Sequence, residues 1–196
     1  MTVSVSLIIV FLMLTMGRIV YRYRWRIRYL FYITKSRLHG YKALAEKEYR
    51  FDAFVSYATD DLPFVKNEVI KELEENGGFT LCLHSRDFLP GFEIAENIVS
   101  AINKSRKTIV ILSPEYIKSY WCMFELNVAR MESVYSRDNE NILFLIMYKD
   151  IGTGDVYIPA ILLDIIERKS YIEYPKEELE RDFFWNNVRD TLSLEN

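Results

Sequence analysis

One carboxylate in the chain has surroundings that could support chemistry. Glu125 follows Trp121 and Cys122 in a stretch whose apolar side chains recur at helical spacing. On a helical wheel Glu125 falls about 80° from the centre of the apolar stripe, at the border of buried surface. Partial burial raises the pKa of a carboxyl group. Glu125 is therefore the main enzymatic candidate, and the competing interpretation is an ordinary glutamate at a helix edge that pairs with a nearby base.

Other catalytic and metal-binding patterns are missing from the sequence. It holds neither of the glycine-rich motifs that cradle phosphate groups. Its two histidines, His39 and His84, leave little material for histidine-based catalysis. Cys82 and Cys122 lack the spacing of a disulfide framework or a metal site, and we interpret both as small buried apolar residues. We expect no metal and no cofactor.

The second candidate is a loop with an unusual mixture of residues. Residues 86–91 read Arg-Asp-Phe-Leu-Pro-Gly and lie between an apolar run at 79–83 and a helical pattern that starts at Glu93. Pro90 fixes its own φ angle and Gly91 permits a positive φ, so we expect a loop of defined shape.

Two interpretations of this loop stay open from the residues alone. Phe88 and Leu89 either fold back onto the end of the sheet or protrude as a contact patch. In the second case Arg86 and Asp87 would add charged specificity to the contact.

These candidates need a scaffold, and the hydrophobic pattern predicts an alternating one. Short apolar strands are expected at 51–56, 79–83, 108–112, 142–147 and 170–174. Helical patterns are expected at about 60–76, 93–103, 114–135 and 176–192. The inward apolar stripes of the second and third of these helices are Ile94, Ile98, Ala101 and Ile102, and Trp121, Phe124, Val128 and Met131. Strands that alternate with helices imply an α/β fold with a parallel sheet and helices on both faces. Five strands suit the flavodoxin-like order, in which ligands meet the loops at the carboxyl ends of the strands.

Charge is divided unevenly along the chain, although the net charge is only −3. Residues 1–45 hold eight of the 25 basic residues and none of the 28 acidic ones. Residues 46–196 therefore carry 17 basic and 28 acidic residues, a net charge of −11. Such a division indicates two environments, and the acidic part argues against a general nucleic-acid binder.

The basic N-terminal part begins with an uncharged run. Residues 1–23 contain an apolar stretch up to Gly17 and, with Arg18 and Arg22 extending toward the lipid surface, reach the length that spans a bilayer. We predict a single-pass transmembrane helix at 1–23, a basic juxtamembrane linker at 24–48 and a cytoplasmic domain at 49–196. A cleaved signal peptide fits less well, because no positive region precedes the apolar run.

Two aromatic segments mark the start and end of the predicted domain. We interpret the first, a strand with the residues Phe51, Asp52, Phe54, Ser56 and Tyr57, as core. The second, Phe184-Trp185 on the closing helix, is assigned to the core in the same way. Asp52 is the exception, because an acid inside a strand needs a partner or the end of the strand.

These two segments and the loop between them resemble, in their order, the three sequence boxes of TIR domains. The stretch Leu-Cys-Leu-His-x-Arg-Asp at 81–87 is most similar to the animal Toll-like receptor version. The resemblance covers residues 49–196 and implies the TIR fold. It also implies a membrane-anchored signalling module of innate immunity, which recruits TIR adaptors and other TIR domains and forms homo- or hetero-oligomers on activation.

The resemblance also assigns roles to residues. The main TIR–TIR surface would comprise Arg86, Asp87, Phe88, Leu89, Pro90 and Gly91, with Glu93 and Glu96 of the following helix as secondary partner-binding residues. Pro90 is the first position at which we expect loss of signalling, and Tyr116 and Trp121 are secondary candidates.

The main alternative is an enzyme. The context of Glu125 also resembles the motif of TIR domains that hydrolyse NAD+, in which the glutamate would stabilise the ribosyl cation, and NAD+ would then be a substrate. A third interpretation places the chain with interleukin-1-type receptors or makes it a membrane-bound decoy.

Overall fold

The computed structural model describes residues 2–38, 49–137, 142–152, 158–159, 162–163 and 171–194. The chain divides into two compact units, Met1–Tyr41 and Lys42–Asn196. Each unit is described by itself.

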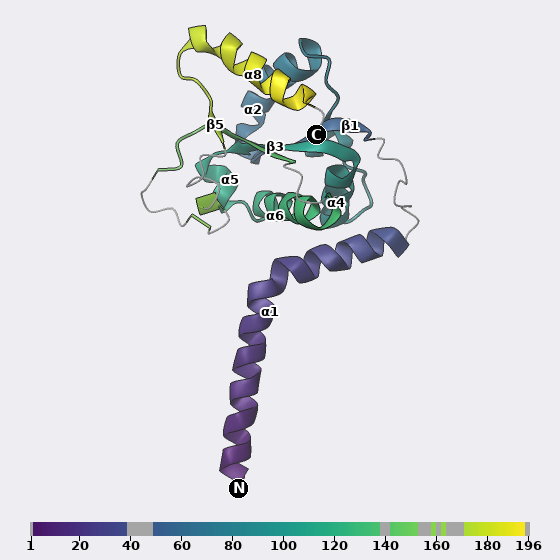
Figure 1. Ribbon diagram of the computed structural model, residues 1–196, viewed down its shortest axis with the longest axis vertical. Helices are drawn as coiled ribbons and strands as arrows, with labels where there is room; N and C mark the ends of the chain where they lie inside the picture. The colour runs from purple at the N-terminus through teal and green to yellow at the C-terminus, as the bar shows by residue number, and fades with distance from the viewer. Residues whose placement is uncertain are drawn as a thin grey trace. The chain divides into compact units, whose positions relative to one another are not determined.

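The first unit is a single helix, α1 (Thr2–Leu38), drawn in purple in Figure 1. Many of its apolar side chains are exposed, including Phe11, Met13 and Leu14. The predicted transmembrane span at 1–23 is not supported, because none of the helices in the described part of the chain is long and apolar enough to cross a membrane. Arginines at positions 18, 22 and 24 follow the apolar run on the same helix. The helix also extends into the predicted linker, and residues 39–48 lie outside the described part.

The second unit is built on a five-stranded parallel sheet in the order β2-β1-β3-β4-β5. The strands are β1 (Phe51–Ser56), β2 (Leu81–Leu83), β3 (Ser105–Leu112), β4 (Leu143–Met147) and β5 (Ile172–Glu173). All four pairings are parallel. This order confirms the predicted flavodoxin-like sheet.

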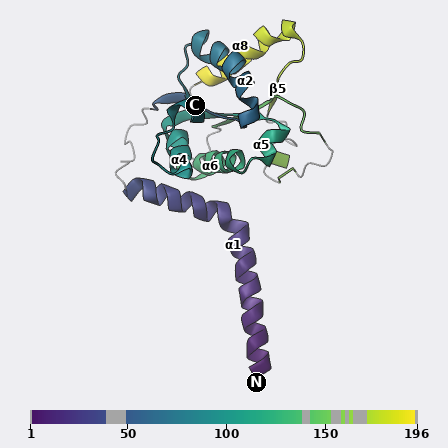
Figure 2. The same cartoon turned by 180° about the vertical axis from the view of Figure 1, so that it is seen from behind.

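Helices cover both faces of this sheet, as Figures 1 and 2 show from opposite sides. One face carries α2 (Leu62–Phe64), its π-helical continuations η2 (Val65–Val69) and η3 (Lys71–Glu75), and the C-terminal α8 (Arg181–Ser193). The other face carries α4 (Ile94–Lys104), α5 (Pro114–Lys118) and α6 (Tyr120–Ser136).

Strand β3 explains the two layers, because its side chains alternate between them. Ile109 and Ile111 pack with the core cluster that contains Trp185, whereas Val110 and Leu112 pack with the cluster that contains Tyr116. All four β3 residues are fully buried, as expected for a central parallel strand.

Several element boundaries differ from the sequence prediction; for example, β3 begins at Ser105 and the closing helix α8 begins at Arg181, after a 3₁₀ turn. Hydrogen bonds explain two further differences. The expected strand at 79–83 is limited to Leu81–Leu83, because Phe79 bonds back to the carbonyl of Leu73 at the end of the preceding helix. The expected single helix at 114–135 is broken at Ser119. There the Ser119 hydroxyl accepts a hydrogen bond from the Cys122 amide at 3.3 Å and starts α6.

Candidate functional site

The candidate residues gather where three parallel strands end. Strands β1, β2 and β3 finish at Ser56, Leu83 and Leu112, so the segments that follow them leave the sheet at its carboxyl edge. The chain continues from β2 into a single helical turn, α3 (His84–Asp87), and then into an irregular segment that reaches α4 at Ile94. Arg86 and Asp87 therefore belong to a helical turn and not to the loop itself.

Arg86 is exposed, but its guanidinium is bonded to neighbouring elements of the same unit. Its two terminal nitrogens bond the two carboxylate oxygens of Glu74, both at 2.9 Å. The same guanidinium also donates to the carbonyl of Leu81. The hydrogen bonds to Glu74 raise the pKa of Arg86 above its ordinary value. A paired fork of this kind positions the turn against η3.

Asp87 has a similar anchoring role. Its carboxylate accepts the Leu83 amide at 2.8 Å and the Arg86 Nε at 3.1 Å. Both charged residues thus hold the start of the loop to the end of β2, and the expectation that they supply charge to a partner finds no support in these contacts.

Phe88 and Leu89 have different environments. The Phe88 ring is half-buried and stacks on Phe54 with centroids 6.3 Å apart and planes 10° apart. His84, which stacks on Tyr57 at 4.3 Å, contacts the Phe88 ring edge-on. Burial lowers the pKa of His84. Leu89, the next residue, is 53 % exposed. The loop folds back at Phe88 and projects from Leu89 onward.

Large apolar side chains are exposed at the end of the loop. Phe92 and Ile94 are 56 % and 49 % exposed, and Pro90, Gly91 and Glu93 are also exposed. We call Leu89, Pro90, Phe92 and Ile94 the loop patch. Sequence reasoning missed Phe92 and placed Ile94 on the inward stripe of the helix. The exposure of Phe92 could have been inferred from its position, because it directly follows Gly91 at the end of the loop.

The loop patch is held in one shape by its neighbours. The Asn97 side chain accepts the Leu89 amide at 3.1 Å and donates to the Leu89 carbonyl at 3.0 Å. Gly91 has a φ of 88°, which a residue with a side chain adopts only at a cost. Asn97 was not identified from the sequence, because nothing in a single sequence marks an amide that closes a loop.

Glu125 lies at the same edge of the sheet but is enclosed. The residue is 4 % exposed, and the Ser56 hydroxyl donates to its Oε2 at 2.5 Å. Ser56 also contacts the Tyr116 hydroxyl at 2.7 Å, and Tyr116 donates to the Cys122 carbonyl at 3.0 Å. Burial raises the pKa of Glu125 to about 8. This buried network, Ser56, Tyr116, Cys122 and Glu125, joins β1 to α5 and α6.

Two further expectations on this face are corrected by burial. Tyr116, considered as a secondary contact residue, is completely buried. Trp121, expected both on the inward stripe of the helix and as a secondary contact residue, is 40 % exposed and packs edge-on against Phe124. The stripe assignment is therefore wrong, and the contact assignment stays a prediction. The break at Ser119 rotates the start of α6 relative to the single helix that the periodicity predicts.

The residues assigned to the core in the first strand lie as follows. Phe54, Ser56 and Tyr57 are buried, whereas Phe51 and Asp52 are half-buried. The carboxylate of Asp52 accepts the Thr80 amide at 2.7 Å and approaches Arg106 at 3.7 Å.

On the closing helix, Phe184 and Trp185 are 8 % and 1 % exposed. They pack together edge-to-face with ring centroids 5.0 Å apart. Both belong to the core cluster on the α8 face of the sheet.

A buried acid near this edge was also missed. Asp61 is 1 % exposed and bonds both the Ser113 hydroxyl, at 2.5 Å, and the ammonium of Lys149, at 2.7 Å. The acid ties the start of α2 to the ends of β3 and β4, so we assign it to the scaffold. In the described part of the chain no group of three or more acidic, histidine or cysteine residues could hold a metal ion.

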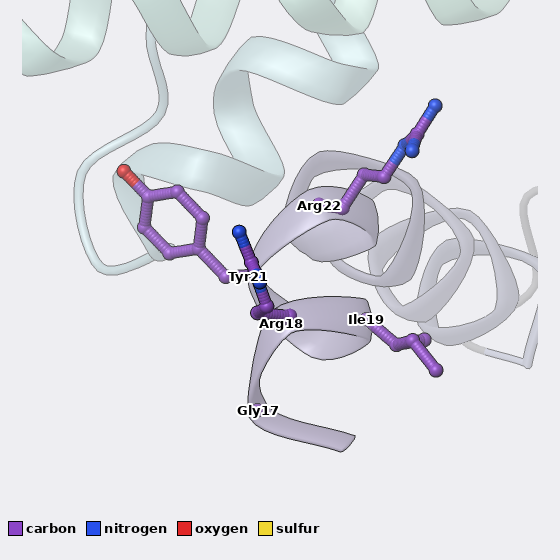
Figure 3. Close-up of a pocket in the computed structure, with 5 residues that line it drawn as sticks. All are labelled: Gly17, Arg18, Ile19, Tyr21 and Arg22. Carbon is purple, nitrogen blue, oxygen red and sulfur yellow. The ribbon is translucent and has the colours of Figure 1, made fainter. Parts of the chain in front are cut away.

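A surface hollow lies on α1, away from these residues in the sequence. It has a volume of about 600 Å³ and is lined by Gly17, Arg18, Ile19, Tyr21 and Arg22 (Figure 3). In Figure 3 the arginines and Ile19 point in different directions from the helix. The hollow includes none of the candidate residues of the second unit.

Comparison with known proteins agrees with this architecture. The TIR domain family matches residues 50–156. A Toll-like receptor 4 of Pinctada imbricata is 50 % identical over 180 residues, which are 90 % of this chain and 20 % of that protein. Human Toll-like receptor 1 is 38 % identical over 76 % of this chain and 19 % of its own length. The chain thus spans about a fifth of the length of these relatives.

Solved structures give the same assignment. The TIR domain of the Toll-related receptor TRR-2 from Hydra magnipapillata superimposes with a TM-score of 0.59 at 26 % identity, over 74 % of this chain and 99 % of that one. A TIR-STING receptor of C. gigas, in complex with 2',3'-cGAMP, gives a TM-score of 0.56 at 25 % identity, over 78 % of this chain and 42 % of that one. With its family match, its receptor relatives and this fold, the chain belongs to the TIR domain family.

Proposed function

We propose that the chain is a signalling module that acts by binding other TIR domains, including those of adaptors, through the loop patch. The observation that carries the proposal is the exposure of Leu89, Phe92 and Ile94, at 53 %, 56 % and 49 %, on one short segment. Contiguous exposed apolar side chains mark interaction sites on soluble domains. The TIR–TIR mode of action comes from the family to which the chain belongs.

The supports of the loop strengthen this proposal. Arg86, Asp87 and Asn97 hold the segment from both ends before any partner arrives. A segment that is already ordered loses less conformational entropy on binding than a mobile one. The charged residues therefore serve the contact through positioning, and the apolar residues make it. Clustering of receptor chains would raise the effective concentration, so that weak contacts are sufficient.

NAD+ hydrolysis by Glu125 is the less favoured alternative. The raised pKa of Glu125 is typical of functional carboxyl groups, but it also follows from burial alone. Because the carboxyl group is enclosed and bonded to Ser56, a dinucleotide would reach it only after the network opened. Nicotinamide release by the full chain, absent in Glu125→Gln, would establish the enzyme.

We also propose that α1 attaches the chain to a lipid bilayer, with the TIR domain on the cytoplasmic side. Exposed apolar side chains follow one another at Phe11, Leu12, Met13 and Leu14, and basic residues begin at Arg18. Such a sequence suits contact with acyl chains followed by contact with anionic headgroups. We expect the full chain to float with liposomes that contain phosphatidylserine. Leu12→Lys combined with Leu14→Lys should reduce the floated fraction, and an unchanged fraction would rule out attachment through α1.

Energy transfer between donor- and acceptor-labelled copies of the full chain tests the binding proposal. Phe92→Ser should weaken association roughly tenfold, the loss that a buried aromatic anchor causes. Val134→Ser is the matched control, because Val134 is 45 % exposed on α6 outside the loop patch. Pro90→His should weaken association while the domain keeps its cooperative melt. Equal association by Phe92→Ser and Val134→Ser would refute the role of the loop patch.

A further inference from the structure

A second apolar surface lies far along the chain from the loop patch. The 3₁₀ turn η4 (Glu178–Glu180) leads directly into α8, which runs along the outer surface of the layer that it shares with α2 (Figure 1). Leu179 is 93 % exposed and Phe183 is 71 % exposed. The two residues are four positions apart, on either side of the junction between the 3₁₀ turn and α8.

These two residues are not displaced members of the core. The inward positions of α8 are taken by Phe184, Trp185, Val188 and Leu192, all of them buried. Phe183 therefore points away from a core that is already complete. An aromatic ring kept in water at this position is unexplained by the stability of the unit.

The charge around the pair is strongly acidic. Four exposed carboxylate residues surround it in the sequence, Glu177, Glu178, Glu180 and Asp182. Among residues 176–183, all of them described, Lys176 is the exposed cation. We call Leu179, Phe183 and these four acids the η4–α8 face.

The arginines that could neutralise this face are turned toward the domain. Arg181 pairs with Glu68 at 3.7 Å and lies over the Tyr174 ring at 5.6 Å. Arg189 bonds Glu72 at 3.0 Å. Both arginines of α8 thus pair with glutamates of η2 and η3. They are therefore not available to neutralise the exposed carboxylates next to Leu179 and Phe183.

We propose that the η4–α8 face binds a basic amphipathic segment of a partner protein. The apolar side chains of the partner would pack on Leu179 and Phe183, and its lysines or arginines would lie opposite the carboxylates. Apolar anchors spaced four residues apart are the usual way in which a helix presents itself to another helix. The four carboxylates would favour a basic partner and increase its rate of association.

Charge disfavours other occupants of this face. Residues 46–196 carry a net charge of −11, so the same domain of a second copy would approach this face against repulsion. The loop patch of a second copy would bring Glu93 with it. Anionic lipid surfaces repel the face for the same reason.

Two fluorescent peptides test the proposal by anisotropy with the full chain. Both are 18-residue amphipathic helices with the same leucine positions, and the remaining positions are lysine in one and glutamate in the other. We expect the lysine peptide to bind at least about tenfold more tightly than the glutamate peptide. Phe183→Ser and, separately, Leu179→Ser should each weaken the lysine peptide roughly fivefold to tenfold.

Matched controls separate this face from general attraction to an acidic protein. Glu178→Lys with Asp182→Lys should weaken binding more than Asp60→Lys with Glu75→Lys, which changes the net charge equally at exposed positions elsewhere. The difference should shrink as salt rises from about 50 to 500 mM. Val134→Ser should bind as the unsubstituted chain does. All these variants replace exposed residues and should melt within a few degrees of it.

The proposal would be wrong if the two charge-reversal pairs weakened binding of the lysine peptide equally. It would also be wrong if neither Phe183→Ser nor Leu179→Ser weakened that binding. Sedimentation of the full chain gives the other decisive result. If Phe183→Ser abolishes self-association, the face is an interface between copies and the basic-partner proposal is wrong. If the chain sediments alike with and without the substitution while peptide binding falls, the partner assignment holds.

Discussion

Two regions at the carboxyl edge of one sheet put their residues to opposite uses. The loop patch exposes apolar side chains on a segment that hydrogen bonds keep in shape. The buried network around Glu125, a short distance away in the fold, encloses the hydroxyl and carboxyl groups that could do chemistry. At this edge the groups that could react are buried and apolar side chains are exposed, an arrangement that supports the proposed binding role.

At this edge of the sheet, residue type alone does not predict whether a side chain supports the loop or is available to a partner. Arg86 and Asp87 are charged and lie beside the loop, yet their bonds are internal. Leu89 and Phe92 are apolar, yet they are exposed. Charged residues build the support, and apolar residues form the surface.

The largest expected effect is the difference in the free energy of unfolding between an alanine substitution in the buried network and one in the loop patch. Tyr116→Ala removes a fully buried ring together with its hydrogen bonds, and we expect a loss of about 3–5 kcal/mol in the free energy of unfolding. Leu89→Ala should change it by less than about 0.5 kcal/mol, because most of the Leu89 side chain is already in water. Urea denaturation measures both. Similar losses of unfolding free energy in the two variants would contradict the distinction between the buried network and the exposed loop patch.

The pH dependence of stability tests the buried network. Burial raises the pKa of Glu125 from its ordinary 4.5 to about 8, so the folded chain keeps a proton that the unfolded chain releases near pH 4.5. The contribution of this carboxyl group to stability is complete below pH 4.5 and is lost as the pH rises to about 8. At about 1.4 kcal/mol per pKa unit, this shift corresponds to a loss of roughly 5 kcal/mol.

Glu125→Gln should flatten that decline, because the amide does not titrate. Urea unfolding of both chains between pH 5 and 8 gives the comparison, and Glu75→Gln, at an exposed position, is the control that should keep the original slope. Parallel slopes for Glu125→Gln and the unsubstituted chain would mean that Glu125 is ionised in the fold.

Asn97→Ala should lower stability only slightly, and it tests how the loop patch is held in shape. Loss of its two bonds to Leu89 should cost about 1 kcal/mol, yet association through the loop patch should fall further, because the segment loses its shape. Energy transfer between labelled copies and urea unfolding are measured together. Asn76→Ala, which removes a single surface bond to Glu72, is the control. A loss of association no greater than that of the control would show that the loop keeps its shape without Asn97.

Much of the scaffold followed from periodicity. The continuous β-branched run at 108–112 predicted a central strand because a parallel strand covered on both faces has no polar side, and β3 has that environment. The boundary at Ser119 was not predicted, since the apolar spacing continues across it and only the cap shows the break. The exposure of Ile94 was missed because its spacing from Ile98 and Ile102 fits an inward stripe, whereas Phe92 was not considered because it lies between the loop motif and the helical pattern.

The sequence by itself determined the order of strands and helices, the parallel sheet and the family, because these depend on local periodicity and on motifs read along the chain. Only the tertiary structure decided which candidate residues are accessible. Contacts such as those from Ser56 to Glu125 and from Arg86 to Glu74 join positions 69 and 12 residues apart. Burial at such places depends on which elements pack over a side chain, and no local pattern records that.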